Sequence, residues 1–551
     1  MGEKNISRRS LMKMGGLAAL GLTGAGALAA CGGQPQSAGT PVASTGGEAT
    51  ATAAEASVPT PWLVAPEPIT DFAETKEYDV VVVGAGAAGL PAALTAFEEG
   101  ATVALLQKEN QAVSQGSAGL GIDLATSDPA GVEAVVSLLE QVNQYRPRRD
   151  LLELWAQNSG EAVQWIIDKV TEAGGKVISQ GNAQVMKYTD FDGAKVNYVS
   201  AFFGPKPYTN TEAMLDLAKI VEASGVEVFY STPAEQLIVD ESGAVTGVAA
   251  KTADGYVQFT ARKGVILATG DYQNDEDMCD FYLPDIKNFA RKQMNKTGDG
   301  HKMGCWAGGR IEPVGHTKML HDFDAGPATM CDLPFLAVDV NGNRFCCETA
   351  PMDVLNNFLK DGDKLKNGEA GWYSQVFDAN YMTACADWPC PKLYTPEELE
   401  NFMPDVEGEK MGVVEGFIRT FRADTLEELA EKIGADSTTF AATVKRYNEL
   451  VASGRDDDFG KPAQFLKPID TPPFYAMNRW LRVSAITSGL VVDGDLQVLN
   501  ENDEPIGGLY AAGNVSGGFY GGIDYPMTLA GLSLGRCYTQ GRYLGRMLAN
   551  K

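Results

Sequence analysis

YDVVVVGAGAAG, residues 78–89, is the stretch of this 551-residue chain that decides its fold. A continuous run of apolar and β-branched residues predicts a central strand of a parallel sheet. Glycines follow at once, and then come a helix-forming segment and a second apolar strand at 102–106. Gly84 permits the sharp turn, Gly86 lets the backbone approach a pyrophosphate, and Gly89 lets the helix pack closely on the strand. In this strand–turn–helix–strand order the motif predicts a Rossmann-type dinucleotide-binding unit, with the phosphates at the helix N-terminus.

The residue that ends the second strand differs from the usual pattern of such a unit. An acidic residue normally stands there and binds the ribose hydroxyls, whereas this chain has Gln107 followed by Lys108. A neutral amide can both donate to and accept from a diol. We therefore expect adenosine binding to be retained at these two residues.

Length and charge bound the class of protein. A chain of 551 residues exceeds one ordinary core, so we expect two domains with appendages. Asp and Glu number 72 against 45 Lys and Arg, a formal net charge of −27, which argues against a nucleic-acid partner because that would need a basic surface. The acidity is typical of an exported protein with a solvated surface. The nine cysteines are placed irregularly, so neither a disulfide framework nor a metal-binding pair is predicted.

The first residues are predicted to direct export and not to fold. Ser7-Arg8-Arg9-Ser10 precedes a short apolar run and resembles a twin-arginine signal, so residues 1–30 read as a signal peptide. That run is too short and too weakly hydrophobic for a stable membrane span. It ends in Leu28-Ala29-Ala30-Cys31-Gly32, which resembles a lipobox, so we expect a lipid anchor at Cys31. The alternative is a plain signal peptide with an incidental cysteine. Residues 31–75 predict a flexible linker.

Later segments repeat the pattern of an apolar strand with a glycine exit. They are a hairpin at 232–239 and 244–248, a buried strand at 264–270, and a last strand at 508–515. Together with residues 78–89 they resemble the nucleotide-domain segments of the fumarate reductase and succinate dehydrogenase flavoprotein superfamily. The resemblance extends from Tyr78 to Lys551. It implies non-covalently bound FAD as the cofactor.

The resemblance also implies the domain organisation. The βαβ rhythm stops between roughly 331 and 485, where helices around 425–433 and 436–453 are expected. We therefore predict an α/β fold with a Rossmann-type FAD-binding domain, formed by residues 76–330 and 486–551, and an inserted α+β capping domain at 331–485. A cap that closes over the flavin would exclude water and hold the substrate in place.

The predicted FAD contacts come from several of these segments. The small residues at 114–121 correspond to the loop beneath the isoalloxazine ring, and Asn514 stands where the family usually has an acidic residue. The helix that starts near Gly531 matches the one whose positive N-terminus faces the flavin N1/O2 edge. The predicted cofactor-binding residues are Gly84, Gly86, Ala87, Ala88, Gly89, Gln107, Lys108, Gly116, Ser117, Gly121, Ala234, Ala268, Thr269, Gly270, Gly513, Asn514, Ser533 and Leu534.

Three departures from the family argue against fumarate as the substrate. True fumarate reductases carry His-Thr where this chain has Ile486-Thr487-Ser488-Gly489, and Asn-Arg where it has 521–528 without arginine. Their proton-donating arginine is expected a few residues after the Phe-Asp of the cap, and Asn380-Tyr381-Met382 occupies that stretch. A dicarboxylate needs bidentate cationic recognition, which these substitutions remove.

Tyr525-Pro526 suggests a different substrate. The pair resembles the Tyr-Pro-Gly stretch of 3-ketosteroid dehydrogenases of the same superfamily, in which the tyrosine helps to polarise a carbonyl. A phenol is a suitable donor to an enone oxygen, so Tyr525 is our first catalytic candidate, with Tyr381 and Tyr520 as secondary ones. The alternative is that Tyr525 only packs against the flavin. The three histidines, His301, His316 and His321, predict no metal site because their spacing forms no ligand cluster.

These observations predict an exported FAD-dependent reductase of a C=C bond conjugated to a carbonyl or a similar acceptor. Hydride would come from flavin N5, and a tyrosine or a cap residue would supply the proton. No CxxCH haem motif is present, so we expect a small unsaturated substrate and a separate electron-donor protein or carrier. The alternatives are an FAD-dependent dehydrogenase of a ketosteroid-like or dicarboxylate substrate, or a non-catalytic flavin-binding lipoprotein.

Overall fold

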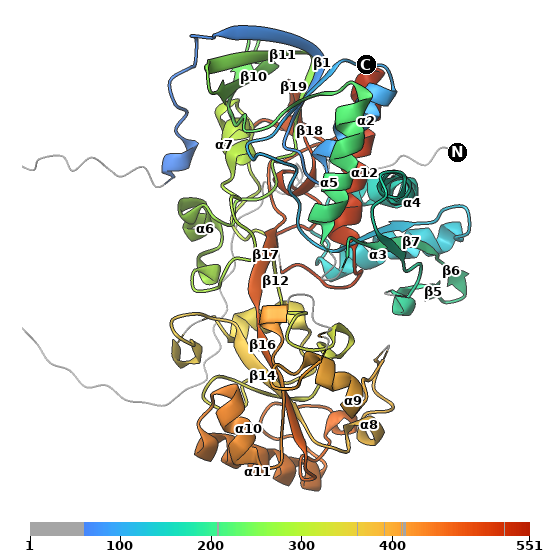
Figure 1. Ribbon diagram of the computed structural model, residues 1–551, viewed down its shortest axis with the longest axis vertical. Helices are drawn as coiled ribbons and strands as arrows, with labels where there is room; N and C mark the ends of the chain where they lie inside the picture. The colour runs from blue at the N-terminus through green and yellow to red at the C-terminus, as the bar shows by residue number, and fades with distance from the viewer. Residues whose placement is uncertain are drawn as a thin grey trace, which may run out of the picture. The chain divides into compact units, whose positions relative to one another are not determined.

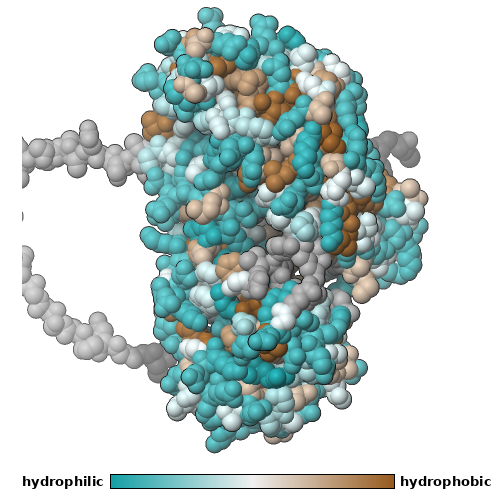
Figure 2. Space-filling model, in the orientation of Figure 1, coloured by the Kyte–Doolittle hydropathy of each residue, from teal (hydrophilic) through white to brown (hydrophobic). Residues whose placement is uncertain are grey.

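A computed structural model describes residues 60–183, 185–205, 209–360, 362–390, 392–408, 410, 415–522 and 524–551. The predicted signal peptide, the predicted lipid anchor at Cys31 and most of the predicted linker lie outside these residues. Within them, no helix is both long and apolar enough to cross a membrane. Hydrophilic residues cover most of the face shown in Figure 2.

A largely parallel sheet forms the first part of the structure (Figure 1). Its strands follow the order β18-β19-β11-β1-β2-β8, and β10 and β9 extend it from β11. β1 pairs in parallel with β2 and β11, and β11 pairs in parallel with β19, so the predicted central position of residues 78–83 is confirmed. The strands are β1 (Glu74–Val83), β2 (Val103–Leu106), β8 (Glu227–Phe229), β9 (Ala234–Val239), β10 (Val245–Thr252), β11 (Gly255–Leu267), β18 (Gln497–Leu499) and β19 (Pro505–Ala511).

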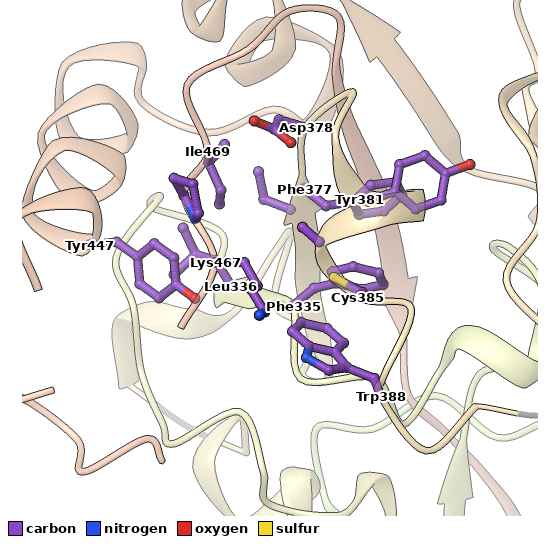
Figure 3. A pocket seen from close by; sticks show the side chains of 13 residues that line it. Phe335, Leu336, Phe377, Asp378, Tyr381, Cys385, Trp388, Tyr447, Lys467 and Ile469 are labelled. Carbon is purple, nitrogen blue, oxygen red and sulfur yellow. The ribbon is translucent and has the colours of Figure 1, made fainter. Parts of the chain in front are cut away.

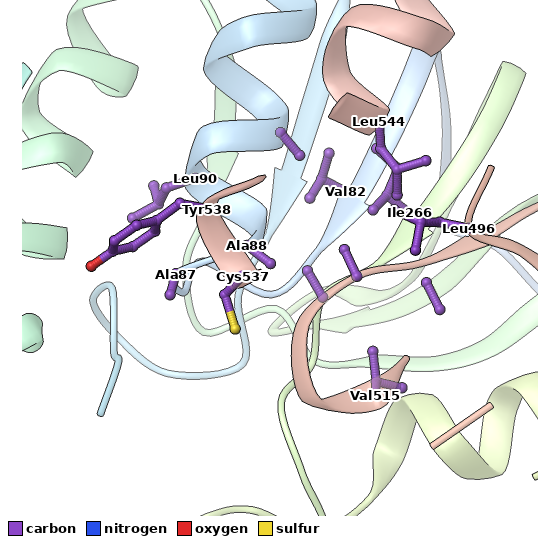
Figure 4. Packing of buried hydrophobic residues seen from close by; sticks show 14 of the residues in the cluster. Val82, Ala87, Ala88, Leu90, Ile266, Leu496, Val515, Cys537, Tyr538 and Leu544 are labelled. Atoms are coloured by element: carbon purple, nitrogen blue, oxygen red, sulfur yellow. The ribbon is translucent and has the colours of Figure 1, made fainter. Parts of the chain in front are cut away.

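The last helix of the chain packs against the first helix after the glycine turn. These are α12 (Leu532–Ala549) and α2 (Gly89–Glu98). A Cβ atom added at Gly541 would lie 2.1 Å from the Ala88 carbonyl oxygen, so glycine is what permits this close approach. In Figure 4, Ala87 and Ala88 lie beside Cys537 and Tyr538 of α12, in the interior that the sheet also lines.

Further helices and short strands complete this first part. A three-stranded sheet, β3-β7-β4, packs on α4 and α12. The remaining elements are β3 (Ala118–Ile122), α3 (Pro129–Val142), α4 (Arg149–Glu172), β4 (Val177–Ser179), β5 (Asp190–Phe191), β6 (Ala194–Lys195), β7 (Tyr198–Phe203), α5 (Asn210–Ser224), α6 (Glu276–Tyr282) and α7 (Asp299–Trp306).

A four-stranded antiparallel sheet with its own core is inserted between β11 and β18. Side chains alternate between its two faces: Val376 and Ala476 face one apolar cluster, and Phe377 and Tyr475 face the other. Its elements are β13 (Leu336–Val338), β14 (Trp372–Phe377), α8 (Tyr381–Ala384), α9 (Pro396–Leu399), β15 (Thr420–Ala423), α10 (Leu426–Ile433), α11 (Ser437–Ser453) and β16 (Phe474–Trp480). The predicted fold class, an α/β Rossmann-type domain with an inserted α+β unit, is confirmed.

Two antiparallel strands, β12 (Lys318–His321) and β17 (Arg482–Ile486), flank this insertion in the sequence and pair with each other. Charged side chains are buried beside this ladder. Arg482 donates to Asp324 at 2.5 Å, and the Lys292 ammonium lies 3.1 Å from His321 Nδ1. Burial lowers the pKa of Lys292 to about 8, although Asp324 opposes that effect. The ladder therefore joins the two parts through a desolvated cluster of charges.

Candidate cofactor and substrate site

The glycine turn after β1 has no room for side chains. Gly84 adopts a φ of +107°, and a Cβ atom there would lie 2.5 Å from the Ala268 carbonyl oxygen. A Cβ atom on Gly89 would lie 1.7 Å from the Gly84 carbonyl oxygen. The N-cap residue of α2 is Ala88, and no side chain of the described residues caps this end of the helix. The Leu90 N–H donates to the Gly86 carbonyl oxygen at 3.1 Å, and Pro91 has no N–H. A phosphate at this turn would therefore meet the positive dipole end of α2 and not the N–H groups of these two residues.

Three parallel strands end around this turn. Ala268, Thr269 and Gly270 follow β11, and Gly513 and Asn514 follow β19, so the chain brings these predicted residues to the carboxyl edge of β1. The Thr269 hydroxyl is buried and has no hydrogen-bond partner among the described residues. An unpaired hydroxyl in a strand-end crevice suits a polar ligand.

Two predicted ribose contacts are already engaged with protein groups. Gln107 Nε2 donates to the Gln111 carbonyl oxygen at 3.2 Å. Lys108 Nζ donates to Thr297 Oγ1 at 2.8 Å and to Asp299 Oδ2 at 2.9 Å. Ala234 starts the neighbouring strand β9. The amide of Gln107 therefore keeps its side-chain oxygen for a diol, while Lys108 has an acidic partner of its own.

The predicted small-residue loop divides between two places. A Cβ atom on Gly116 would lie 3.0 Å from Leu534 Cδ1, so this glycine faces the first turn of α12. The Ser117 carbonyl oxygen accepts from the Phe203 N–H at 3.2 Å. Gly121 lies instead against α4, where a Cβ atom would be 2.2 Å from the Ser159 carbonyl oxygen. Gly116 thus lies beside α12, and Gly121 serves the packing of β3 on α4.

These features together fit FAD. The N-terminus of α2 lies at the strand ends, where it can receive the pyrophosphate. The N-cap residue of α12 is Gly531, whose φ is +92°. No side chain of the described residues caps this end of the helix. The Leu532 N–H donates to the Leu529 carbonyl oxygen, and the Ser533 N–H faces Tyr525. It is therefore the positive dipole end of α12 that can stabilise the anionic edge of an isoalloxazine ring. Gly116 leaves space opposite Leu534, where any side chain would intrude.

Two of the three candidate tyrosines lie together at this end of α12. The Tyr520 and Tyr525 rings are 4.8 Å apart between centroids, and both are buried. Burial raises the pKa of Tyr525 to about 12, while Tyr520, Arg536 and the Ser533 backbone N–H lower it. The Tyr520 hydroxyl makes no hydrogen bond of standard geometry with the described residues, although it lies close enough to affect Tyr525. Tyr525 is therefore a neutral phenol with a proton to donate.

A buried arginine supports these tyrosines from α12. Arg536 is fully buried, and its Nη2 donates to Asn514 Oδ1 at 2.8 Å. Its guanidinium lies 5.2 Å from the centroid of the Tyr520 ring and 5.5 Å from that of Phe519. The Nε atom has no partner among the described residues. The positive charge is consequently held beside Tyr520 and Tyr525 without a hydrogen-bonded carboxylate.

Tyr381 lies in a different cluster from the other two tyrosines. It packs against Phe377 and Tyr475 in the core of the inserted sheet, and its hydroxyl donates to the Tyr394 carbonyl oxygen. In Figure 3 this hydroxyl points away from a pocket bounded by Phe377 and Trp388. The pocket holds about 20 Å³, which is room for one or two waters and not for an organic substrate. The structure does not bring Tyr381 to Tyr520 and Tyr525.

A group of acidic residues beside Tyr525 was not among the sequence candidates. Asp524 accepts from Asn356 Nδ2 at 3.1 Å and from Asn357 Nδ2 at 2.9 Å, and it pairs with Lys318 at 3.1 Å. Asp353 lies near it on the same 3₁₀ helix as both asparagines. The partners are more than 160 residues apart in the sequence, so no local signal connects them; only Asp524 stands out, as an added acid in a glycine-rich loop.

The histidines take structural positions. His301 is fully buried on α7, and burial lowers its pKa to about 4. His316 lies 2.6 Å from the Tyr272 hydroxyl and stacks on Tyr282 with ring centroids 3.9 Å apart. Among the described residues, no group of three or more His, Cys, Asp or Glu is arranged to hold a metal ion.

Comparison with known proteins identifies relatives over most of the chain. The family described as FAD binding domain matches residues 79–526. A vinyl phenol reductase of Lactiplantibacillus plantarum is 28% identical, over 87% of this chain and 97% of that protein. An NADH:acrylate oxidoreductase of Vibrio harveyi is 29% identical, over 85% of this chain and 50% of that protein. The chain therefore spans nearly all of the first relative and about half of the second.

The fold has a solved counterpart as well. The open conformation of a flavocytochrome c3 fumarate reductase superimposes with a TM-score of 0.64 at 24% sequence identity. The match covers 87% of this chain and 79% of that one. The glycine turn, the strand ends around it and the inserted sheet all lie within residues 79–526, which the family matches.

Proposed function

The chain belongs to the FAD binding domain family, and from this premise we propose that it reduces a carbon–carbon double bond conjugated to a carbonyl or a similar acceptor. Its cofactor is FAD, and the enzyme is an oxidoreductase of the fumarate-reductase-like kind that acts on CH–CH groups. The observation that carries the proposal is the pair of buried phenols, Tyr520 and Tyr525, at the N-terminus of α12. The named relatives support it, because they reduce vinyl phenols and acrylate.

The residues of the chain divide the work. FAD, when bound, supplies hydride at N5 to the β-carbon of the substrate. The Tyr525 hydroxyl donates a hydrogen bond to the substrate carbonyl oxygen, where negative charge develops. Arg536 and the Ser533 N–H lower the pKa of Tyr525, so the phenol is a stronger donor than an isolated buried tyrosine. The inserted domain excludes water from the reacting atoms.

Charge around the site favours a neutral substrate over a dicarboxylate. Asp353 and Asp524 lie beside the Tyr525 loop, and Asp332 lies near Asp353. Lys318, which contacts Asp524, is shared with Asp285 at 2.8 Å. A substrate with two carboxylates would meet repulsion from these acids, and the single guanidinium of Arg536 can pair with only one of the two carboxylates. We therefore propose an uncharged enone, an aryl alkene or a similar acceptor.

An anaerobic substrate screen tests the proposal. The FAD-loaded enzyme is mixed with reduced methyl viologen and with enones, aryl acrylates, vinyl phenols, steroid enones or fumarate. We expect oxidation of viologen with at least one neutral acceptor and only a slow background with fumarate. Fast turnover of fumarate would overturn the charge argument. Tight FAD binding without turnover of any acceptor would favour a binding protein instead of an enzyme.

We also propose that a lipid anchor at Cys31 holds the enzyme at the membrane outside the cytoplasm, and that the enzyme receives electrons from a separate donor. The support is the twin-arginine and lipobox resemblance in residues 7–32. The test compares the wild type with Cys31→Ala and with Arg8→Lys/Arg9→Lys in cells fed a labelled fatty acid. We expect label in the wild type only, release of Cys31→Ala from the membrane fraction, and retention of the double variant inside the cell. Unlabelled wild-type protein in the soluble cytoplasm would contradict this proposal.

A further inference from the structure

Two segments distant in the sequence lie beside the loop that carries Tyr525. One is the 3₁₀ helix Met352–Phe358, which packs on β12. The Asn356 side chain donates two hydrogen bonds. One goes to the Asp353 carbonyl oxygen of the same helix at 2.7 Å, and the other goes to the Asp524 carboxylate at 3.1 Å. On the other side, the Tyr525 N–H donates to the Lys318 carbonyl oxygen at 2.9 Å. The Tyr525 loop is thus fastened to the helix through Asp524 and to β12 through the Tyr525 N–H.

Asp353 lies at the centre of this junction and is poorly satisfied as an anion. Its Oδ1 atom is buried, and no donor among the described residues bonds it. The Met527 backbone N–H, two residues after Tyr525, faces the same carboxyl group and favours its charged form. A buried carboxylate oxygen without a partner is costly, so the geometry favours a proton on this group.

The charged and titratable neighbours act in the same direction. Burial, together with the Asp332 and Asp524 carboxylates, raises the pKa of Asp353 to about 6. Tyr188 faces both Asp332 and Asp353, and those two carboxylates raise its pKa as burial does. Lys318 is the cation of the junction, and it is held by Asp524 and Asp285. Asp332 itself is exposed, and it acts on Asp353 through its charge.

We propose that Asp353 is the catalytic residue that protonates the substrate carbon, with Asp332 as the positioning residue whose negative charge favours the protonated form of Asp353. This inference rests on the proposed reductase function and assigns its acid. As hydride reaches the β-carbon, the O–H bond of Asp353 breaks and a C–H bond forms at the α-carbon. Asp353 is left as a carboxylate and regains a proton from water. The two electrons come from the reduced cofactor, which an external one-electron donor such as a reduced viologen re-reduces.

The two groups at the site then have separate tasks. Tyr525 holds its proton at any physiological pH and suits a hydrogen bond to the carbonyl oxygen. Asp353 exchanges its proton near neutral pH and suits transfer to carbon, because a general acid works best when its pKa lies near the working pH. Tyr525 lies on the α12 side of the loop, facing the Ser533 N–H, while Asp353 lies on the β12 side, facing the Met527 N–H.

The test uses the FAD-loaded enzyme and the best acceptor from the screen. Asp353→Asn, Asp353→Glu, Asp332→Asn and the matched exposed control Asp387→Asn are compared in stopped-flow oxidation of the reduced enzyme between pH 4.5 and 9. We expect the wild-type rate to fall above about pH 6. Asp353→Asn should lower kcat by about 10²–10⁴-fold with KM and FAD content little changed. Asp353→Glu should restore part of the rate, and Asp387→Asn should match the wild type.

Asp332→Asn gives a readout that a merely structural role would not move. Removal of the Asp332 charge should lower the pKa of Asp353 and shift the fall in rate to lower pH, with the low-pH plateau retained. Infrared titration should show a protonated carboxyl band that disappears near pH 6 in the wild type and is absent from Asp353→Asn.

The outcomes separate the two proposals. If none of the acceptors oxidises the reduced wild-type enzyme, the proposed function fails. Independently of that result, absence of an infrared carboxyl titration near pH 6 would overturn the assignment of Asp353. If the wild type turns over and Asp353→Asn stays within threefold of it with the same pH profile, the reductase stands and Asp353 is not its acid. If Asp353→Asn loses FAD, the pH profiles of the oxidation rate in Asp353→Glu and Asp332→Asn test the inference instead. Profiles that match the wild type in both variants would overturn it.

Discussion

Arg536 donates to the side-chain oxygen of Asn514 across 2.8 Å in the interior of the FAD-binding part of the chain. By the resemblance to the flavoprotein superfamily, position 514 usually carries an acid, which would neutralise such a cation. Here an amide takes its place, so the guanidinium beside Tyr520 and the N-terminus of α12 has no hydrogen-bonded carboxylate among the described residues, and it interacts with the acid Glu312 through charge. The neutral partner therefore leaves a buried positive charge at the expected flavin edge.

Removal of that amide should destabilise the protein. Asn514→Leu leaves the buried guanidinium of Arg536 without its main acceptor, and loss of a hydrogen bond to a charged group costs about 1.5–3 kcal/mol. Asn514→Asp keeps the acceptor and adds an opposite charge, so its free energy of unfolding should be no lower than that of the wild type. Urea denaturation followed by tryptophan fluorescence measures both. Equal stability of Asn514→Leu and the wild type would show that the contact carries no weight.

Substitution in the glycine turn should abolish cofactor binding. Gly89→Ala places a methyl group 1.7 Å from the Gly84 carbonyl oxygen, so the turn must open and the N-terminus of α2 must move. We expect at least a hundredfold increase in the Kd for FAD, measured by flavin fluorescence quenching on apoprotein. The control is Gly416→Ala, where a methyl group meets no atom within 4 Å. Normal FAD affinity in Gly89→Ala would refute the role of this turn.

The three candidate tyrosines should separate in activity. Tyr525→Phe removes the donor to the substrate oxygen and should reduce kcat/KM by about 10²–10³-fold, the usual effect of losing one such donor. Tyr381→Phe should leave kcat/KM within twofold, because the Tyr381 hydroxyl is spent on the Tyr394 carbonyl oxygen in another core. Steady-state kinetics with the best acceptor measures both. An unchanged Tyr525→Phe enzyme, or a strongly impaired Tyr381→Phe enzyme, would reverse the assignment.

Acid should destabilise the fold partly through His301. Burial lowers its folded pKa from 6.5 to about 4, so between these values the unfolded chain binds a proton that the folded chain does not. Stability from this group is present above pH 6.5 and is lost as the pH falls towards 4, by about 1.4 kcal/mol per pH unit. His301→Gln should therefore show a flatter decline than the wild type in urea denaturation between pH 6.5 and 4.5. Parallel declines would mean that His301 titrates normally in the fold.

Local patterns in the sequence predict most of the elements that hold FAD. The apolar run at 78–83 and the glycines after it specify a parallel strand and a turn by themselves. Thr425 and Asp436 cap α10 and α11 with hydrogen bonds to Glu428 and Thr439, so these helices begin where their capping residues indicate. Such features depend on neighbours within a few residues, which a single sequence displays.

The substrate side depends on contacts that no local pattern displays. Asp353 is one of 72 acidic residues, and its sequence neighbours are unremarkable. What distinguishes it is its contact with the Met527 N–H and the nearby charge of Asp332, both of which the fold brings to it from other segments. Tyr381 is the opposite case. Its position after the Phe-Asp of the cap predicted a place in the active site, but the preceding strand β14 places it in the core of the inserted sheet, against Phe377. Position along a chain predicts a side chain's role only when the same element also fixes its direction.

The packing of α12 against α2 sets the moment in biosynthesis at which the cofactor can be captured. Residues up to 267 already supply β1, β2 and β11, yet β19 and α12 come from the last fifty residues. A ribosome that adds about 5–20 residues per second therefore holds an incomplete crevice for tens of seconds. A chain truncated before Leu532 lacks the helix that faces Gly116 and Ala88. Flavin retention thus reports that synthesis has passed α12, and the yellow colour of the protein gives a direct assay of that point.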